Sequence, residues 1–332
     1  MLSIAMLVNL TLAGSPVAAS VSVTSVSAWH QLMLDSSSGL PGCFQATFPS
    51  LVWQVGKCST PTGMIPANVG AQYGDEAAST TGTIGDSSGT FPSETGFTSE
   101  TDNVSGSNHF SLQVDSNFFS TVCGPYFSCS GQSVQGWEQF IAQNGVLNTV
   151  KVVIEYWLVN YTAPGSGNSS CPSGDIPDGG TAWQAVQGTY DCTAFSAYYS
   201  PAPEAESPAY LYDMGLGGSA NLQSSGHDSV AYCFYTSCYE VSVPDNVIYL
   251  YKYWQFSEFN VLGFGGGSEA IFNSGFSLTV KNQLYNSNNG PITTSCDHIV
   301  PSTTAETNNL NLGSCTATNS KTGTYIAFSE SD

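Results

Sequence analysis

The chain has 332 residues, with 25 acidic and only five basic side chains, and a formal net charge of −20 at pH 7. A phosphate backbone would be repelled by this charge, so we expect no nucleic-acid partner. Hydrophobic residues make up 41% of the chain, which excludes wholesale disorder and provides a core for one large β domain or two smaller ones. The acidic balance also suits a protein that works at low pH, where protonation of carboxylates reduces self-repulsion.

The N-terminal residues resemble a secretory signal peptide. An apolar run extends over residues 4–13 and small residues follow at 17–20, although the usual basic residue before the apolar run is missing. No later stretch is long and apolar enough to cross a bilayer. We therefore expect a secreted protein with a signal peptide at 1–20, an N-terminal extension at 21–80, either a packed first element or a propeptide, and a β-sandwich domain at 81–332.

The ten cysteines of a secreted chain indicate disulfides rather than a metal site. No Cys-x-x-Cys sequence occurs and the four histidines lack metal-ligand spacing, so we expect no metal and no cofactor. Asn-x-Ser/Thr sequences begin at Asn103, Asn160 and Asn168 and would accept glycans in a eukaryotic glycoprotein. Proximity in the sequence suggests the pairs Cys43 with Cys58, Cys123 with Cys129, Cys171 with Cys192, Cys233 with Cys238, and Cys296 with Cys315.

Strand patterns dominate the chain. The stretch at 81–104, rich in Ser, Thr and Gly, suggests either a loose loop or short exposed strands. Many turn residues and few helix signals predict an all-β, disulfide-linked antiparallel sandwich. In chain order we expect a short helix at 28–34, a hairpin within 43–58, strands at 108–115, 136–141, 150–160, 228–235, 247–252 and 324–328, a helical turn or strand at 209–222, and a strand pair at 253–262 and 270–280 around the glycines 265–267.

Two polar residues stand out on the predicted strands. Alternation places Gln113 on one face with Ser111 and Asp115, opposite the apolar residues of the same strand. The same period of two places Glu258 on a face with Asn260. A carboxylate in such apolar surroundings is costly unless it is hydrogen-bonded or takes part in chemistry. Glu258 and Gln113 are therefore the candidate functional residues.

The segments WQFSEFNVLGFGGGSEAIFNSG, QGWEQFIAQ, IEYWLVNY and ETNNLNL resemble a widespread family of secreted microbial proteins without an assigned function. More remotely, two strands resemble the glutamic peptidases of the eqolisin and neprosin type, which are concanavalin-like, jelly-roll sandwiches. Leu112–Phe118 is similar to the Leu-Gln-x-Gly-Val-Asp-Phe strand that carries their catalytic glutamine, and Ser257–Asn260 to the Ala-Glu-Trp-Ile strand that carries their glutamate. The glycine after the glutamine is absent here, and Phe259 replaces the tryptophan.

This resemblance implies a secreted acid hydrolase that cleaves an extracellular polypeptide. Glu258 would be the general acid/base and Gln113 the donor to the oxyanion. Trp137 and Tyr156 are candidate substrate-binding residues, although aromatic strand residues more often belong to the core. The alternative is a non-catalytic, lectin-like sandwich that binds a glycan, in which Glu258 and Gln113 hold sugar hydroxyls.

Two other constellations are weaker. Glu155 and Glu258 could form a carboxylate pair as in glycoside hydrolases, but Glu155 is expected to be solvated. His227 and Asp228 could belong to a hydrolase triad, yet no Gly-x-Ser-x-Gly sequence accompanies them. We expect His227 and Asp228 to lie in a surface loop.

Overall fold

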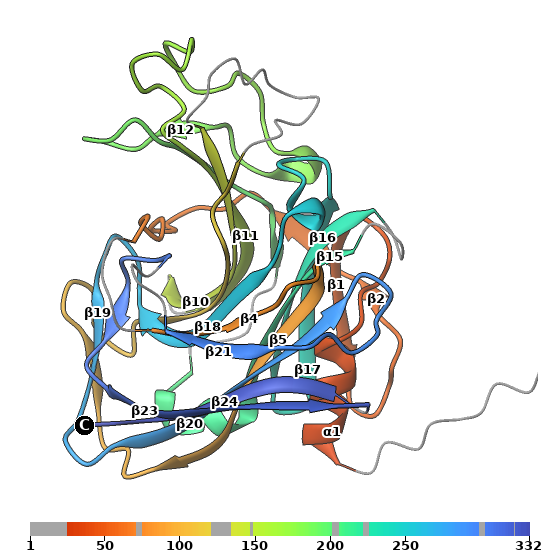
Figure 1. Cartoon of the computed structure of the whole chain (residues 1–332), viewed down its shortest axis with the longest axis vertical. Helices are drawn as coiled ribbons and strands as arrows, with labels where there is room; N and C mark the ends of the chain where they lie inside the picture. Colours follow the sequence, from red (N-terminus) through yellow and green to blue (C-terminus); the bar gives the residue numbers. More distant parts are fainter. Residues whose placement is uncertain are drawn as a thin grey trace, which may run out of the picture.

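The computed structural model describes residues 25–70, 75–120, 134–146, 149–200, 206–221, 226–298, 303–321 and 323–332. Two nine-stranded sheets, antiparallel throughout, form a disulfide-linked all-β sandwich, with two small sheets at its margins (Figure 1). The predicted signal peptide and the predicted pair Cys123 with Cys129 lie outside the described residues. No helix in the described part of the chain is long and apolar enough to cross a membrane.

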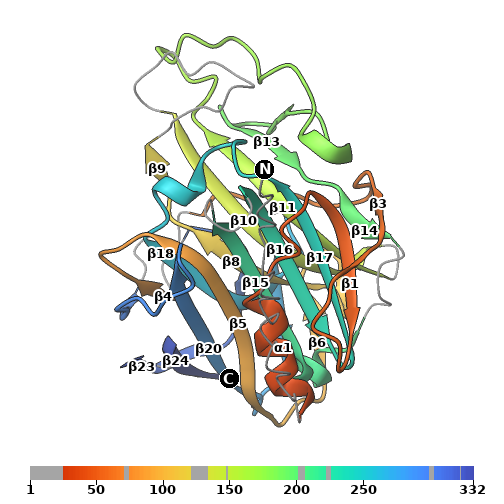
Figure 2. The ribbon, with the colours of Figure 1, turned by 90° about the vertical axis from the view of Figure 1, so that its right-hand side faces the viewer.

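The first sheet has the strand order β2-β1-β17-β16-β15-β5-β20-β24-β23. Helix α1 (Val26–Leu34) packs on β15 and β16, and Figure 2 shows it lying across this sheet. The strands are β1 (Gly42–Thr47), β2 (Gln54–Val55), β5 (Ile84–Thr95), β15 (Met214–Asn221), β16 (His227–Phe234), β17 (Ser237–Pro244), β20 (Ser277–Asn286), β23 (Asn311–Ser320) and β24 (Gly323–Ser331).

The second sheet has the order β12-β13-β11-β10-β8-β18-β4-β21, and β9 pairs with β10. Its strands are β4 (Glu76–Ser79), β8 (Phe110–Ser116), β9 (Phe119–Ser120), β10 (Gln135–Val146), β11 (Thr149–Val159), β12 (Gln184–Ala185), β13 (Cys192–Phe195), β18 (Phe256–Gly263) and β21 (Ser295–His298). The small sheets contain β3 (Lys57–Ser59) with β14 (Tyr198–Ser200), and β6 (Glu100–Asp102), β7 (Gly106–Ser107), β19 (Glu269–Phe272) and β22 (Thr307–Asn308). The described residues also form three short 3-10 helices: η1 (Pro177–Gly179), η2 (Pro208–Asp213) and η3 (Leu250–Lys252).

Strand β5 shows why a Gly- and Ser-rich stretch lies at the centre of a sheet. A Cβ atom at Gly89 would lie 2.0 Å from the ring of Phe259, which projects from the opposite sheet. A Cβ atom at Gly218 of β15 would likewise lie 2.3 Å from the ring of Phe140. Small residues on one sheet therefore make room for large aromatic rings on the other, so that the core is close-packed. The composition suggested either a loose loop or short exposed strands at 81–104, whereas the structure has the long strand β5 there, and residues 84–89 of that strand are buried.

The predicted helix and most predicted strands are confirmed, with two exceptions. The runs at 253–262 and 270–280 are not one hairpin, because β18 belongs to the second sheet and β20 to the first, while β19 pairs with β6 and β22. The predicted strand at 247–252 contains η3 instead. Four predicted disulfides are present: Cys43–Cys58, Cys171–Cys192, Cys233–Cys238 and Cys296–Cys315.

The segment predicted as an N-terminal extension contributes strands to both large sheets. Strand β1 pairs with β17 in the first sheet. Strand β4 lies between β18 and β21 in the second sheet. Residues 65–70, between β3 and β4, lie against the outer face of the second sheet, where Ile65 and Ala67 donate to Gln143 and Glu155.

Candidate functional site

Glu258 and Gln113 lie on adjacent strands and on the same face of the second sheet. In the pairing of β18 with β8, Glu258 is opposite Asp115 and Asn260 is opposite Gln113. Residues directly opposite each other share a face, so Glu258 and Gln113 are diagonal neighbours, a relation that spans about 7–8 Å between backbone positions. The structure thus brings together the two residues that the sequence singled out.

A row of polar side chains extends from this pair across four strands. Glu258 of β18, Asp115 of β8, Gln139 of β10 and Glu155 of β11 are successive cross-strand partners. We call these four residues the polar row. Each of them is at most 1% exposed. The alternation of residues along the strand predicted that Asp115 lies on the same face as Gln113. No sequence pattern predicted that the four residues of the polar row would lie next to one another on four strands.

The amide of Gln113 is held in one orientation by its neighbours. Its Oε1 accepts a hydrogen bond from Nε2 of Gln139 at 3.0 Å, and its Nε2 donates to Oγ of Ser111 at 2.7 Å. The Ser111 hydroxyl in turn donates to the carbonyl oxygen of Gly263 at 2.7 Å. Because Nε2 carries two hydrogens, one donor of Gln113 remains for a ligand on this face.

Two chain segments, residues 65–70 and 303–306, cover the polar row. The backbone N–H of Ala67 donates to Oε2 of Glu155 at 3.1 Å. The hydroxyl of Thr303 donates to Oε2 of Glu258 at 2.5 Å. The backbone N–H of Asn68 donates to both carboxylate oxygens of Glu306 at 3.0 and 3.1 Å. These covering segments account for the burial of a face that the residue pattern alone would place in solvent.

The covering segments also bind each other. The backbone N–H of Gly70 donates to the carbonyl oxygen of Thr303 at 2.9 Å. The backbone N–H of Ala305 donates to the carbonyl oxygen of Asn68 at 3.0 Å. A Cβ atom at Gly70 would lie 2.1 Å from the carbonyl oxygen of Thr304, so only glycine fits there. Figure 1 shows the first covering segment, in orange, passing near β11.

Burial dominates the electrostatics of the polar row. It raises the pKa of Glu258 well above its ordinary value, and the charges of Asp75 and Asp115 raise that pKa further. Burial likewise raises the pKa of Asp115 and, despite hydrogen bonds from Thr193 and Ala67, the pKa of Glu155. No Lys or Arg side chain forms an ion pair with these groups in the described part of the chain, where the one ion pair joins His298 to Glu76. The carboxyl groups of the row therefore hold their protons to unusually high pH.

The structure separates the two predicted substrate-binding aromatic residues. Trp137 and Gln139 are two residues apart on β10, so the side chain of Trp137 lies on the face of the polar row. There its ring contacts that of Trp157, with 5.7 Å between the ring centroids. Tyr156 lies on the opposite face, paired with Glu138, in the core between the two sheets. Both side chains are 0% exposed. Only Trp137 lies on the same face as Glu258.

Two predictions for acidic residues are wrong. Glu155 is fully buried rather than solvated, because Ala67 and Thr193 cover and bind its carboxylate. It is also three strands from Glu258, about 14 Å at the usual strand spacing, which is too far for a glycosidase carboxylate pair. His227 and Asp228 begin β16 rather than a surface loop, and Asp228 is 0% exposed.

A second acidic cluster lies between the sheets. Glu138 of β10 and Asp228 of β16 face each other across the core near the hydroxyl of Tyr156, and all three side chains are 0% exposed. Neither carboxyl group nor the hydroxyl has a hydrogen-bond partner among the described residues. Burial raises the pKa of Asp228 well above its ordinary value, and the charge of Glu138 raises it further. This pair is stable only while protonated.

Replacing one member of this pair should stabilise the protein at high pH. We expect Asp228→Asn to raise Tm at pH 8 by about 5 °C or more, because the substitution removes an ionisable group from the core. At pH 4, where the native carboxyl is already neutral, Tm should change little. Differential scanning calorimetry at both pH values tests this, with Asp297→Asn at an exposed position of β21 as the control. An unchanged or lower Tm of Asp228→Asn at pH 8 would contradict the expectation.

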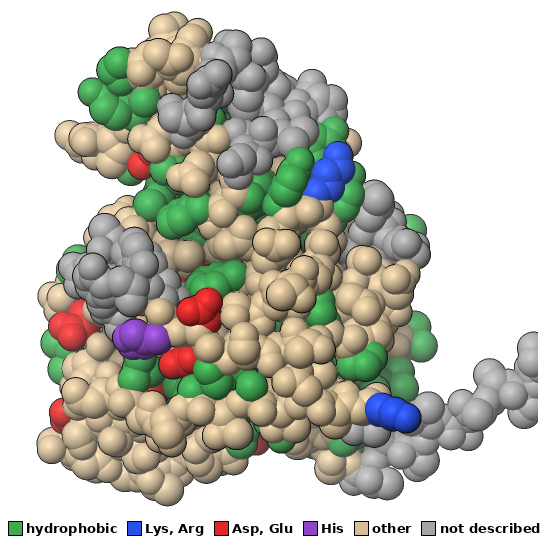
Figure 3. Space-filling model, in the orientation of Figure 1, with side chains coloured by type: hydrophobic (Ala, Val, Ile, Leu, Met, Phe, Trp, Pro, Cys, Tyr) green, Lys and Arg blue, Asp and Glu red, His purple; other side chains and the backbone are tan. Residues whose placement is uncertain are grey.

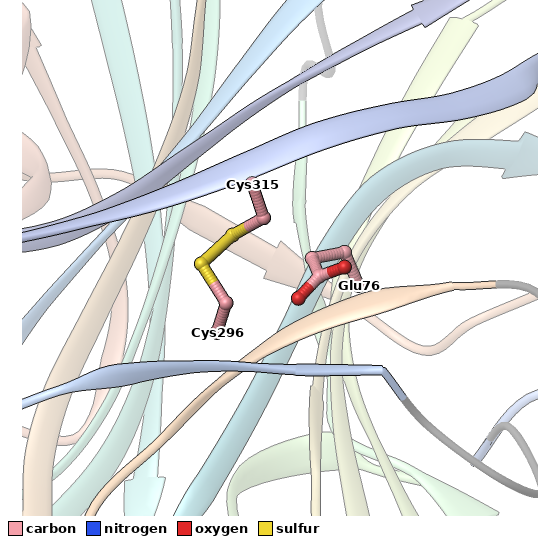
Figure 4. A group of neighbouring side chains, drawn as sticks. All are labelled: Glu76, Cys296 and Cys315. Carbon is pink, nitrogen blue, oxygen red and sulfur yellow. A yellow bond between two sulfur atoms is a disulfide. The ribbon is translucent and has the colours of Figure 1, made fainter.

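One group of potential metal ligands occurs among the described residues. A carboxylate oxygen of Glu76 and the sulfur atoms of Cys296 and Cys315 lie within 4.8 Å of one another. Figure 4 shows that the two sulfur atoms are joined in a disulfide. A disulfide lacks the thiolates that bind metals, so this group provides one carboxylate rather than a metal site.

Comparison with known proteins returns no matching protein-family model, no matching curated protein and no matching solved structure. The function is therefore inferred from the side chains and their geometry alone.

Proposed function

We propose that this chain is a secreted acid hydrolase of the glutamic-endopeptidase type, with Glu258 as general acid/base and Gln113 as oxyanion donor. The observation that supports it most is the diagonal placement of these two residues on adjacent strands of one water-excluded face. The amide of Gln113, fixed by Gln139 and Ser111, is preorganised as such a donor must be. Four disulfides fit an extracellular location.

The chemistry follows from the two side chains. When the covering segments move and water reaches Glu258, the burial that raises its pKa is relieved and its carboxyl group ionises. The carboxylate takes a proton from a water molecule, and the oxygen of that water attacks the peptide carbonyl carbon. The carbonyl oxygen becomes an anion that the free N–H of Gln113 stabilises. Glu258 then gives its proton to the amide nitrogen as the C–N bond breaks, which releases a carboxylic acid and an amine. Asp115, directly opposite, favours the protonated form of Glu258 needed in this last step.

Substrate access requires movement of the covering segments, because Glu258 and Gln113 are each only 1% exposed. A cavity of about 160 Å³ lies beside the first covering segment and is lined in part by Met64, Thr193 and Phe195. Thr193 donates to Glu155 at 2.7 Å, so this cavity adjoins one end of the polar row. Figure 3 shows that this side of the molecule is hollowed below the upper loops, with hydrophobic side chains in the hollow.

The Gln113→Ala variant tests the proposal. On a denatured protein substrate at pH 3–5, we expect kcat to fall by about 10²–10³ with little change in KM, because the donor acts on the transition state. Gln283→Ala, at a buried glutamine of β20 in the other sheet, is the control and should retain activity. Full activity of a folded Gln113→Ala variant would remove Gln113 from the mechanism.

A sugar-binding role for the polar row has less support. A lectin-like face presents aromatic rings to solvent, but Trp137 and Tyr156 are 0% exposed. Exposed tyrosines occur elsewhere, above all near α1 on the side of the first sheet.

A further inference from the structure

Three exposed tyrosines form a cluster next to the first sheet. Tyr210 and Tyr212 lie on η2 and Tyr235 lies at the turn between β16 and β17, and their exposed fractions are 38%, 54% and 43%. The ring of Tyr210 is 5.8 Å from that of Tyr235 and 6.5 Å from that of Tyr212, measured between centroids. We call these three residues the tyrosine cluster. Exposed aromatic groups gathered in one place commonly mark a binding surface.

Tyr235 is held outward at a conformational cost. Its φ of 48° lies in the left-handed region, which is rare for a bulky aromatic residue. The Cys233–Cys238 disulfide closes the turn on both sides of it. Its carbonyl oxygen is hydrogen-bonded to Nε2 of His30 on α1 at 2.6 Å. Tyr235 is the first residue of the two-residue loop between β16 and β17, where hairpin turns require a positive φ, so the turn fixes the position of its ring.

A pocket with both polar and apolar lining residues adjoins the tyrosine cluster and shares Tyr212 with it. It has a volume of about 530 Å³ and is lined by Tyr212, Asp213, His30 and the serines that precede and begin α1. This volume falls in the range of small-ligand sites. The one cationic residue in its lining, Lys281, donates to Oε1 of Gln283 at 2.8 Å and lies over the ring of Tyr325. The pocket therefore offers hydroxyls, a carboxylate and aromatic faces, and one ammonium group that already contacts Gln283 and Tyr325.

We propose that the tyrosine cluster and this pocket bind a neutral glycan chain. The apolar C–H face of a sugar ring packs on an aromatic ring, and its hydroxyls donate to a carboxylate such as that of Asp213. The net charge of −20 disfavours phosphates and anionic lipid surfaces. The three ring systems carry hydroxyl groups and are tilted by 58° and 59° to one another, which suits a single glycan chain better than a flat crystalline surface.

This site is independent of the proposed peptidase chemistry. Tyr235 connects two strands of the first sheet, whereas Glu258 lies on the outer face of the second sheet. Glycan binding here would hold the protein on a polysaccharide matrix while leaving the polar row free. A result on one site does not decide the other.

Affinity electrophoresis and calorimetry of the full chain test the proposal. The probes are soluble β-glucan, xylan, mannan and a chitin oligosaccharide. We expect binding to at least one of them, at least a tenfold loss of affinity in Tyr212→Ala and in Tyr235→Asn, and retention in Tyr212→Phe, which keeps the ring. Asn is chosen at 235 because it tolerates a positive φ.

The matched control is Tyr190→Ala, at a 51% exposed tyrosine outside the cluster, which should bind as the wild type does. Absence of binding to every probe would overturn the proposal. Equal affinity of the wild type and of folded Tyr212→Ala would also overturn it. Binding to neutral phospholipid vesicles or to denatured protein through the same tyrosines, without glycan binding, would assign the surface to another ligand.

Discussion

The protein should lose much of its stability between pH 4 and pH 8. Burial raises the pKa of Glu100 and of Glu330 to about 8 and that of Glu240 to about 7. In the unfolded chain these groups titrate near pH 4.5, so between that pH and the folded pKa the unfolded state binds fewer protons. The free energy of unfolding therefore falls as pH rises through this window and is highest below about pH 4.

The expected effect is large because many buried carboxyl groups act together. A fully buried glutamate such as Glu330, 2% exposed, contributes on the order of a few kcal/mol, against a total stability of roughly 5–15 kcal/mol for a typical protein. Calorimetry at pH 4, 6 and 8 should show Tm falling by more than about 10 °C. The fall should persist in 0.5 M NaCl, because salt screens surface repulsion but does not solvate the core. An equal or higher Tm at pH 8 would show that the buried carboxyl groups do not control stability in this range.

Local alternation predicted part of the site. A period of two was enough to place Gln113 with Asp115 and Glu258 with Asn260, and the paired strands keep both relations. Disulfide pairing followed from sequence proximity, because each confirmed pair closes a loop of at most 21 residues. These are short-range features, which the order of residues determines directly.

Long-range contacts determine the rest. Residues 65–70 and 303–306 are more than 230 positions apart, yet they meet over the polar row. The burial of Glu155 results from its contacts with Ala67 and Thr193, which are 88 and 38 positions away, so no local pattern could distinguish this residue from a solvated one. The central position of β5 likewise depends on Phe259, which approaches Gly89 from the other sheet.

Glu258→Gln should abolish peptidase activity and leave the fold intact. Glutamine cannot accept the proton of water or pass one to the leaving amine, so we expect kcat to fall by about 10³ or more. It is isosteric with the protonated carboxyl, and its Oε1 can still accept the hydrogen bond of Thr303. Tm at pH 4 should therefore be unchanged, and Tm at pH 8 should rise.

Glu240→Gln provides the matched control. Glu240 is also fully buried, but it lies on β17 of the first sheet, where Ser37 and Ser38 donate to its carboxylate. Its substitution should leave peptidase activity unchanged. Loss of activity in both variants would indicate a general effect of removing buried carboxyl groups.

The most direct test is digestion of one denatured protein at pH 3–5 by the purified wild type and by Glu258→Gln, in parallel, with new N-termini identified by mass spectrometry. We expect cleavage by the wild type and none above background by a variant of equal Tm. Equal cleavage by both proteins would exclude Glu258 as the acid/base. Absence of cleavage by the wild type, even after proteolytic removal of residues 65–70, would contradict the peptidase assignment itself.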